Sequence, residues 1–366
     1  MFDKLGKRKY ILPIIGVIVI CCVMSLVLYP MLNAQAKNVP LAIVSLDKGA
    51  STPKGEMNIG SQIVEKITNT AGSDDKDAVI EWTKLKNQAA VDKALEENVY
   101  YGALIIPEDF TIQQAAAQSG KDTVPTVKLL INQGKNTMLA STIQTALTSM
   151  VDQMAMKAEV KVVHPVSSNG GALSALMGVQ MTVMPLFMMS MIAAVLLFLA
   201  TRSLRDSFEK KKALGLTLIY AVGLSFLVSW GTIFSASVFG NIDMPVATVM
   251  LFLWLASFSV IMLIFGALSV TFPLGVTVLL LVFACGMSSA MIAPEMLPSF
   301  WSNWIYPWVP QHYIGDGMRE ILYMNGSVWN TGSLALISTA GIGIVLAIIG
   351  TYMPRKIMDN KIAENM

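Results

Sequence analysis

Charged residues are scarce in this 366-residue sequence. Asp, Glu, Lys and Arg make up 14% of it, whereas an average soluble domain carries roughly 25%. Hydrophobic residues make up 54%, and the mean hydropathy is +0.59. Five long stretches contain no charged residue: residues 10–36, 162–201, 213–242, 244–294 and 321–354. This distribution excludes an ordinary soluble protein and predicts a protein that crosses a membrane several times.

Cysteine and histidine are nearly absent, with three and two residues. Cys21, Cys22 and Cys285 all fall in charge-free stretches, where thiols are more often small apolar residues than ligands or nucleophiles. No arrangement of Ser, His and Asp and no paired carboxylate within these stretches suits catalysis. We therefore expect neither a metal site nor an enzyme activity in this chain. The net charge of +2 gives no indication of a nucleic-acid partner.

A phosphate-binding loop of the form GxxxxGK[ST] is also missing. Gly120-Lys121 and Gly134-Lys135 both lack the upstream glycine and the hydroxyl residue that would follow. We expect no cofactor in this chain, and any energy from ATP has to come from a partner that binds the nucleotide.

The charge-free stretches have room for six membrane-spanning helices, because each needs about 20 mostly apolar residues. Four stretches hold one span each, and the stretch at 244–294 holds two, with a turn at 271–275. The predicted spans are residues 10–30, 172–201, 213–239, 246–270, 274–294 and 332–353.

The basic residues predict which side of the membrane each loop occupies. Lys and Arg cluster in the N-terminal segment 1–9, in residues 202–212 and in the tail 354–366. Loops rich in Lys and Arg stay in the cytoplasm, so we expect these three segments and both termini there. Placing the five basic residues of 202–212 in the bilayer would cost on the order of 3 kcal/mol each. The first apolar run is too long for a cleaved signal peptide, which predicts an uncleaved anchor.

Residues 31–171 differ from the rest of the chain. They hold 28 of the 50 charged residues, in balanced signs and with neither Arg nor Cys. Strand patterns alternate with helical patterns, the helices being expected at 58–69, at 88–97, from Pro107 onward, and from 135 to 163. The strands are expected at residues 41–46, 79–85, 101–106 and 126–131. This predicts an extracellular α/β domain with a mixed sheet, inserted between the first two spans of an α-helical polytopic membrane protein.

Several short motifs in this layout resemble one known family. They are Asp47-x-Gly49 after the first strand, Ile106-Pro107-Glu108-Asp109-Phe110, and Leu297-Pro298-Ser299-Phe300-Trp301 followed by Pro307, Pro310, Tyr313 and Arg319-Glu320. Together with the order of one span, an exported domain and five spans, they resemble the permeases of ABC-2 type transporters. The resemblance covers nearly the whole chain and is closest to the phage-infection-protein-like branch of that family.

The resemblance implies a homo- or heterodimer of six-helix permeases in a bacterial cell membrane, surrounded by membrane lipid. Each permease would bind a separate cytoplasmic ATPase, which holds the ATP and magnesium. The loop 202–212 would form the helix that couples the two proteins, and its expected contact residues are Arg202, Leu204, Arg205, Asp206, Phe208 and Glu209. Leu204 and Phe208 are four residues apart and can share a helical face. The lysines of this loop are also explained as ordinary cytoplasmic charges.

Residues 295–331 contain too many prolines for a span. Trp301, Trp304 and Trp308 have the spacing of one helical face, which suits either an aromatic belt at the membrane surface or a re-entrant hairpin at the outer gate. The ionisable residues of this segment are Glu295, His312, Asp316, Arg319 and Glu320. The spacing predicts an ion pair of Asp316 with Arg319 that pins the hairpin, and contact with the substrate is the alternative.

The second predicted span is rich in methionine around Pro185, at positions 181, 184, 188, 189 and 191. Methionine is mainly an adaptable apolar residue, and no His or Cys accompanies these five, so a copper site is not expected. Pro185 is expected to kink the helix.

The sequence therefore predicts a permease that exports an amphipathic or hydrophobic compound, such as a drug, lipid or peptide, with ATP hydrolysed by a partner. The alternative is a membrane-anchored receptor or secretion-accessory protein whose extracellular domain binds a partner. An ion-coupled transporter is disfavoured, because no acidic residue lies within a predicted span.

Overall fold

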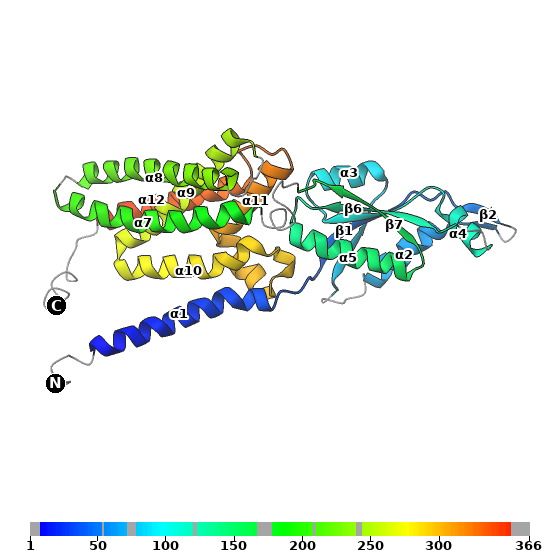
Figure 1. The fold of residues 1–366 in the computed structure, drawn as a ribbon, viewed down its shortest axis with the longest axis horizontal. Coiled ribbons are helices and arrows are strands. Elements are labelled where there is room, and N and C mark those ends of the chain that lie inside the picture. Colours follow the sequence, from blue (N-terminus) through cyan, green and yellow to red (C-terminus); the bar gives the residue numbers. More distant parts are fainter. Residues whose placement is uncertain are drawn as a thin grey trace.

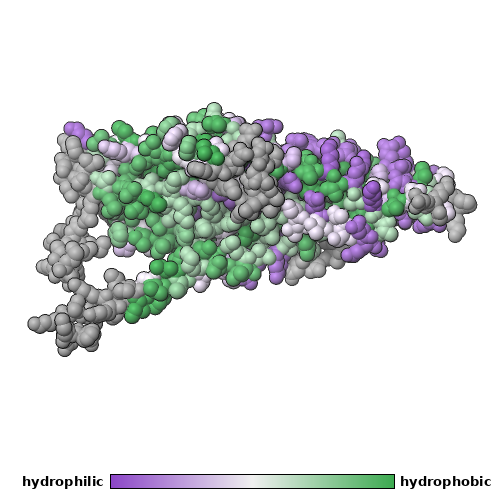
Figure 2. All heavy atoms as spheres, in the orientation of Figure 1, coloured by the Kyte–Doolittle hydropathy of each residue, from purple (hydrophilic) through white to green (hydrophobic). Residues whose placement is uncertain are grey.

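The protein has two parts that follow one another along its long axis, a helical bundle and an α/β domain (Figure 1). The computed structural model describes residues 8–52, 55–71, 78–119, 123–166, 178–207, 210–238 and 244–352. In the view of Figure 2, hydrophobic residues dominate the surface of the bundle, whereas hydrophilic residues gather on the α/β domain. This division is the one expected when lipid surrounds the first part and water the second.

Within the described residues, six helices are long and apolar enough to cross a membrane. They are α1 (Arg8–Leu32), α7 (Gln180–Ser207), α8 (Lys210–Val238), α9 (Val246–Val270), α10 (Phe272–Met291) and α12 (Thr331–Tyr352). The chain is thus a multi-pass membrane protein, as the charge-free stretches predicted.

Helix α9 is the most buried of the six and packs against α12, α7, α8 and α10. Its contact with α12 depends on glycine: a Cβ on Gly266 would lie 2.2 Å from the carbonyl oxygen of Gly343. Ser259 Oγ also donates a hydrogen bond across this contact, to the carbonyl oxygen of Leu336 at 2.7 Å. Small residues and hydroxyl groups of this kind hold helices together in a bilayer.

Helix α1 lies at the edge of the bundle, packs against α10 and runs away from the other helices toward its N-terminal end (Figure 1). Most side chains between Ile14 and Leu26 are exposed, whereas Val27 and Pro30 are buried. The apolar side chains of α1 therefore face the surroundings of this single chain over most of its length.

The α/β domain is built on a five-stranded mixed sheet with the order β4-β1-β5-β6-β7. The strands are β1 (Val39–Ser45), β4 (Ile80–Lys84), β5 (Gly102–Ile106), β6 (Thr126–Asn132) and β7 (Lys157–Val163). Within this five-stranded sheet, as far as the structure describes it, β5 and β6 pair antiparallel and the other neighbouring strands pair parallel. A separate hairpin of β2 (Ala50–Thr52) and β3 (Gly55–Met57) follows the first strand.

Helices cover both faces of this sheet. They are α2 (Ile59–Ala71), α3 (Gln88–Glu96), α4 (Phe110–Gln118) and α5 (Thr137–Gln153). Leu41 and Ile43 of β1 contribute to the core under α2 and α5, whereas Ala42 and Val44 contribute to the core under α3. The alternation of these four residues is the period of two expected of a strand covered on both faces.

Two predictions for this domain were wrong. The helix expected over 135–163 ends at Gln153, and residues 157–163 form strand β7. These residues alternate polar and apolar side chains from Lys157 onward, which is a strand pattern, and they complete the sheet beside β6. Pro107 is not the first residue of a helix either, since α4 begins at Phe110 after a turn in which the Phe110 N–H donates to the Pro107 carbonyl.

The spans also differ in their ends from the predicted ones. Helix α7 continues to Ser207 and α8 begins at Lys210, so most of the predicted loop 202–212 is helical. Helix α10 begins directly after Thr271, whose side chain accepts a hydrogen bond from the Leu274 N–H, so the turn before it is shorter than predicted. Polar residues therefore do not by themselves end these helices, because a helix can extend beyond the bilayer.

Candidate functional site at the domain end of the bundle

Residues 293–324, called the cap segment below, follow α10 and contact both the bundle and the α/β domain. They form the helical turns η2 (Pro294–Met296), η3 (Trp301–Ile305) and η4 (Tyr306–Trp308) and then helix α11 (Pro310–Tyr323). Pro294, Pro307 and Pro310 lie at the first or second position of these turns and helices, where a missing N–H removes no helical bond. Because each of these prolines begins a new turn or helix, the stretch is broken into short pieces and does not form one membrane-spanning helix.

The predicted ion pair is present on α11. Arg319 Nη2 donates a hydrogen bond to Asp316 Oδ1, about one turn earlier in the helix. The Arg319 side chain is buried, whereas that of Asp316 is half exposed. Burial alone would lower the pKa of Arg319, but the carboxylate of Asp316, together with Tyr306 and Tyr101, outweighs burial and raises that pKa. The pair stabilises a buried positive charge within one turn of α11, and its expected role in pinning the hairpin remains a prediction.

Glu295 connects the cap segment to the α/β domain. The Tyr101 hydroxyl, just before β5, donates a hydrogen bond to Glu295 Oε2 at 2.8 Å. Burial of the phenol raises the pKa of Tyr101, and the neighbouring carboxylate raises it further, so the hydroxyl keeps its proton and remains a donor. Lys135 Nζ lies 4.8 Å from the centre of the Tyr101 ring and donates to the carbonyls of Asn98 and Val99. The sequence pattern points to Glu295 but carries no signal for Tyr101 or Lys135.

His312 lies between two aromatic rings in the cap segment. Its ring centre is 4.1 Å from that of Tyr306 and 3.7 Å from that of Tyr313, and its Nδ1 lies 2.8 Å from the Val309 carbonyl oxygen. Burial lowers the pKa of His312, against the opposing effect of Asp316. At neutral pH the ring is therefore uncharged and donates through Nδ1.

Glu320, the last of the predicted ionisable residues, is half buried on α11. Burial raises the pKa of its carboxyl group, and the negative charge of Asp316 raises it further. This carboxylate therefore lies in a less favourable environment than a fully exposed one.

Gln311 is a buried residue that sequence analysis did not single out. Its side-chain Nε2 donates to the Val282 carbonyl oxygen of α10 at 2.8 Å. A Cβ on Gly286 would lie 1.9 Å from the same amide nitrogen, so the absence of a side chain on α10 makes room for Gln311. Gln311 Oε1 and Trp301 Nε1 are buried without a hydrogen-bond partner among the described residues.

The prediction that three tryptophans share one helical face was wrong. Trp301 is 3% exposed and packs near Tyr29 of α1, whereas Trp304 is 71% and Trp308 47% exposed. The chain passes from a π-helical turn into a 3₁₀ turn here, which changes the rotation per residue from that of an α-helix. Of these three tryptophans, Trp304 and Trp308 are exposed, and their role in an aromatic belt remains a prediction.

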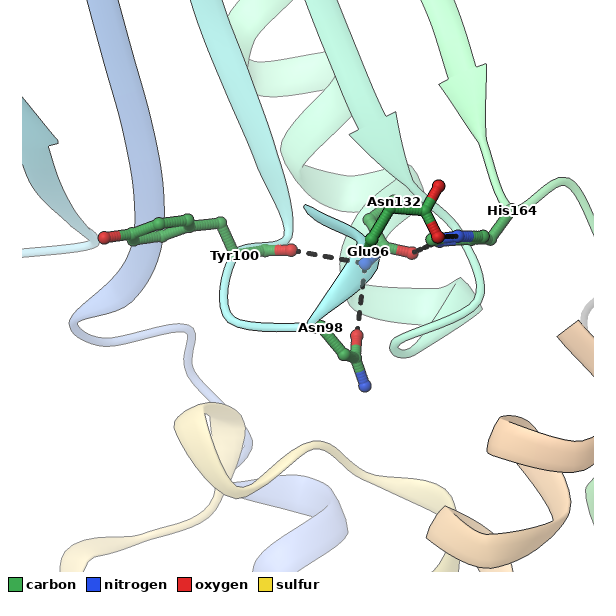
Figure 3. A network of polar contacts seen from close by, with 5 residues as sticks. All are labelled: Glu96, Asn98, Tyr100, Asn132 and His164. Carbon is green, nitrogen blue, oxygen red and sulfur yellow. Dashed lines mark hydrogen bonds and ion pairs between the residues drawn. The ribbon is translucent and has the colours of Figure 1, made fainter. Parts of the chain in front are cut away.

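A network of polar side chains lies at the end of the α/β domain nearest the cap segment (Figure 3). Asn132 Nδ2 donates to Asn98 Oδ1 at 3.1 Å and to the Tyr100 carbonyl at 3.4 Å. Its Oδ1 lies 3.2 Å from His164 Nδ1, and His164 Nε2 lies 3.3 Å from Glu96 Oε2. Because the Asn132 amide donates to a backbone carbonyl, its oxygen accepts from His164. The network ties the end of β6 to the chain before β5 and after β7.

One family model matches the sequence across the bundle, the cap segment and the α/β domain. A family model for ABC-2 family transporter proteins matches residues 8–352. The chain belongs to the ABC-2 transporter family. No curated protein and no solved structure matches it.

As a member of the ABC-2 family, the chain is the membrane component of a transporter and works with an ATPase subunit. The predicted contact residues Arg202, Leu204, Arg205 and Asp206 belong to the last turns of α7, at the end of the bundle away from the α/β domain (Figure 1). Phe208 and Glu209 lie outside the described residues. Pro185 lies inside α7. Among the described residues, no three His, Cys, Asp or Glu side chains form a group that could hold a metal ion.

Proposed function

We propose that this ABC-2 family chain is the permease subunit of an ATP-driven exporter. The observation that carries the proposal is the family match over residues 8–352, which spans a six-helix bundle with a broken, partly buried cap segment at one end. Irregular helix at the edge of a bilayer is tolerated where it packs on protein or lines a wet cavity. The cap segment therefore has the structure expected of an outer gate.

The proposed substrate is an amphipathic or hydrophobic compound, such as a drug, lipid or peptide. The side chains that line the six spans are apolar or carry hydroxyl groups, and charged residues are confined to the ends of the bundle and to the α/β domain. Such a bundle has few groups that can replace the hydration of an ion, so it favours a substrate with apolar surface.

In the proposed orientation the α/β domain is extracellular, and the junction of α7 and α8 faces the cytoplasm. The basic residues near this junction support this orientation. A cytoplasmic ATPase, holding ATP and magnesium, would bind at residues 202–209. The exposed apolar side chains of α1 leave a face for a second permease subunit, so we propose a dimer. Membership of the phage-infection-protein-like branch and a bacterial host are parts of the same proposal.

Transport by inverted membrane vesicles tests the proposed function. Vesicles that contain the chain and its cognate ATPase should accumulate at least one of three probes, a hydrophobic dye, a fluorescent phospholipid or an amphipathic peptide, when ATP is added. Vesicles with a catalytically inactive ATPase are the control. ATP-independent accumulation, or none with any probe, would favour the alternative, a receptor or secretion-accessory protein whose domain binds a partner.

A further inference from the structure

The α/β domain and the cap segment share a continuous hydrophobic core. Ala293 and Met296, at the start of the cap segment, pack among the core residues of the domain, and Ala293 is almost completely buried there. The backbone on the domain side contributes too: the Gln35 N–H donates to the Met296 carbonyl at 3.0 Å, and the Lys37 N–H donates to the Glu295 carbonyl at 2.9 Å. The cap segment is therefore bound to the domain and not merely adjacent to it.

The far end of the cap segment is also in contact with the domain. Gly134 follows β6, and a Cβ at this position would lie 3.1 Å from the Cβ of Tyr323 and 3.3 Å from the terminal methyl group of Met324. Gly134 is buried by this contact and by His164. The domain thus touches both ends of the cap segment, at Glu295 and at Tyr323.

The bond between Tyr101 and Glu295 is a side-chain hydrogen bond that crosses this junction. It joins the hydroxyl of Tyr101, a residue that is 2% exposed, to a carboxylate, and hydrogen bonds to charged groups are stronger than neutral ones. The positive charges of Lys135 and Arg319 lie near the same two groups. If the cap segment moved away from the domain, the hydrogen bond between Tyr101 and Glu295 would break. Both groups would then lack a partner at a site that water reaches poorly, which costs free energy.

We propose that Tyr101 and Glu295 are positioning residues that hold the cap segment closed against the α/β domain, and that transport requires the two to separate. The domain would then act as a clamp on the outer gate of the transporter. This inference rests on the proposed function for its role in transport, whereas the clamp itself can be tested without transport.

A buried reporter cysteine measures the separation directly. In the full chain with Cys21→Ser, Cys22→Ser and Cys285→Ala, the added change Ala293→Cys places a thiol inside the shared core. The rate at which a maleimide labels it reports how often the cap segment leaves the domain. A hydrogen bond to a charged group contributes enough for Tyr101→Phe to raise this rate about tenfold. Glu295→Gln, which keeps an acceptor but loses the charge, should raise it less.

Tyr100→Phe is the matched control, because it removes a hydroxyl from the neighbouring residue, which packs against the core under α3 and not against the core that contains Ala293. It should leave the labelling rate unchanged. The clamp proposal would be wrong if Tyr101→Phe labelled at the same rate as the protein that keeps both tyrosines. It would also be wrong if Tyr101→Phe and Tyr100→Phe raised the labelling rate equally. If Tyr101→Phe fails to fold, the comparison of Glu295→Gln with the background decides in the same way.

The effect of ATP hydrolysis on labelling shows whether the contact between Tyr101 and Glu295 opens during transport or only stabilises the fold. In the complex with the ATPase that co-purifies with the chain, ATP should accelerate labelling of Ala293→Cys, and an inactive ATPase should not. Equal labelling with and without ATP, in a complex that transports a probe, overturns the gating role and leaves the proposed function intact. If no ATPase binds and no probe moves, the proposed function and the gating role fall together, while the Tyr101 comparison still decides the clamp.

Discussion

At the scale of single residues, the α/β domain depends on one carboxylate. Asp47 is buried and accepts hydrogen bonds from the N–H groups of Gly49, Gly60 and Thr111 and from the Thr111 hydroxyl. Gly60 and Thr111 lie in the first turns of α2 and α4, so one side chain satisfies the free donors of two helices. The motif Asp47-x-Gly49, noticed in the sequence as a family resemblance, thus has a structural explanation in this chain.

Replacing Asp47 should destabilise the domain in a pH-dependent way. Asp47→Ala leaves the helix donors without their acceptor, and we expect the free energy of unfolding to fall by about 2–4 kcal/mol at pH 7. Burial tends to raise the pKa of Asp47, but the hydrogen bonds outweigh it and lower that pKa below 3.8. The stabilisation is therefore complete above pH 3.8 and is lost as the pH falls through the lower, folded-state value.

Denaturation of the full chain in detergent at several pH values measures this difference. The parent and Asp47→Ala should differ most near neutral pH and converge in acid. Thr68→Ala is a suitable control, because the Thr68 hydroxyl donates to carbonyls of the same helix, α2. A difference that is absent at pH 7, or that grows on acidification, would contradict the role assigned to Asp47.

At the scale of elements, the contact between α9 and α12 depends on where glycine lies. A Cβ on Gly343 would be 2.3 Å from the Met262 backbone carbon, and one on Gly350 would be 2.3 Å from the Ser269 backbone carbon. Gly341, on the same helix, has nothing within 4 Å of the Cβ position. Gly343 and Gly350 therefore permit the close approach of α9 and α12, and Gly341 does not take part in it.

Gly343→Ala should force α9 and α12 apart and lower the free energy of unfolding by about 1–3 kcal/mol, the cost of overpacking a core. Gly341→Ala should be neutral or stabilise by up to about 1 kcal/mol, because alanine favours a helix. Thermal unfolding of the two variants in the same detergent makes the comparison. Equal melting temperatures would show that the two helices are not packed as described.

Some of these elements and contacts could be predicted from the sequence, and others could not. The spans follow from length and absence of charge, and the Asp316–Arg319 pair follows from a local spacing of three. Strand β7 was missed because the helical pattern before it was extended too far, although its alternation was visible. The bond between Tyr101 and Glu295 joins residues 194 positions apart, and neither residue carries a local signal of the other. Contacts between segments that are distant in the sequence can be identified only from the three-dimensional structure.

At the scale of the whole molecule, the proposed orientation predicts which cysteines an impermeant reagent can reach. In a background without the three native cysteines, Ile112→Cys places a thiol on the exposed face of α4. Ser207→Cys places one at the opposite end of the molecule, at the end of α7. A membrane-impermeant maleimide should label Ile112→Cys in intact cells and Ser207→Cys only after the membrane is opened. The reverse pattern would contradict the orientation.

Capture of the partner ATPase is the direct test of the proposed function. The tagged chain, purified from its native host in a gentle detergent, should bring a cytoplasmic ATPase with it, identified by mass spectrometry. Leu204→Asp and Phe208→Asp should abolish this capture, because an acidic residue replaces an apolar contact, whereas Ser203→Asp should retain it. Purification with only extracellular or secretion proteins, or an ATPase bound equally well by all three variants, would contradict the account.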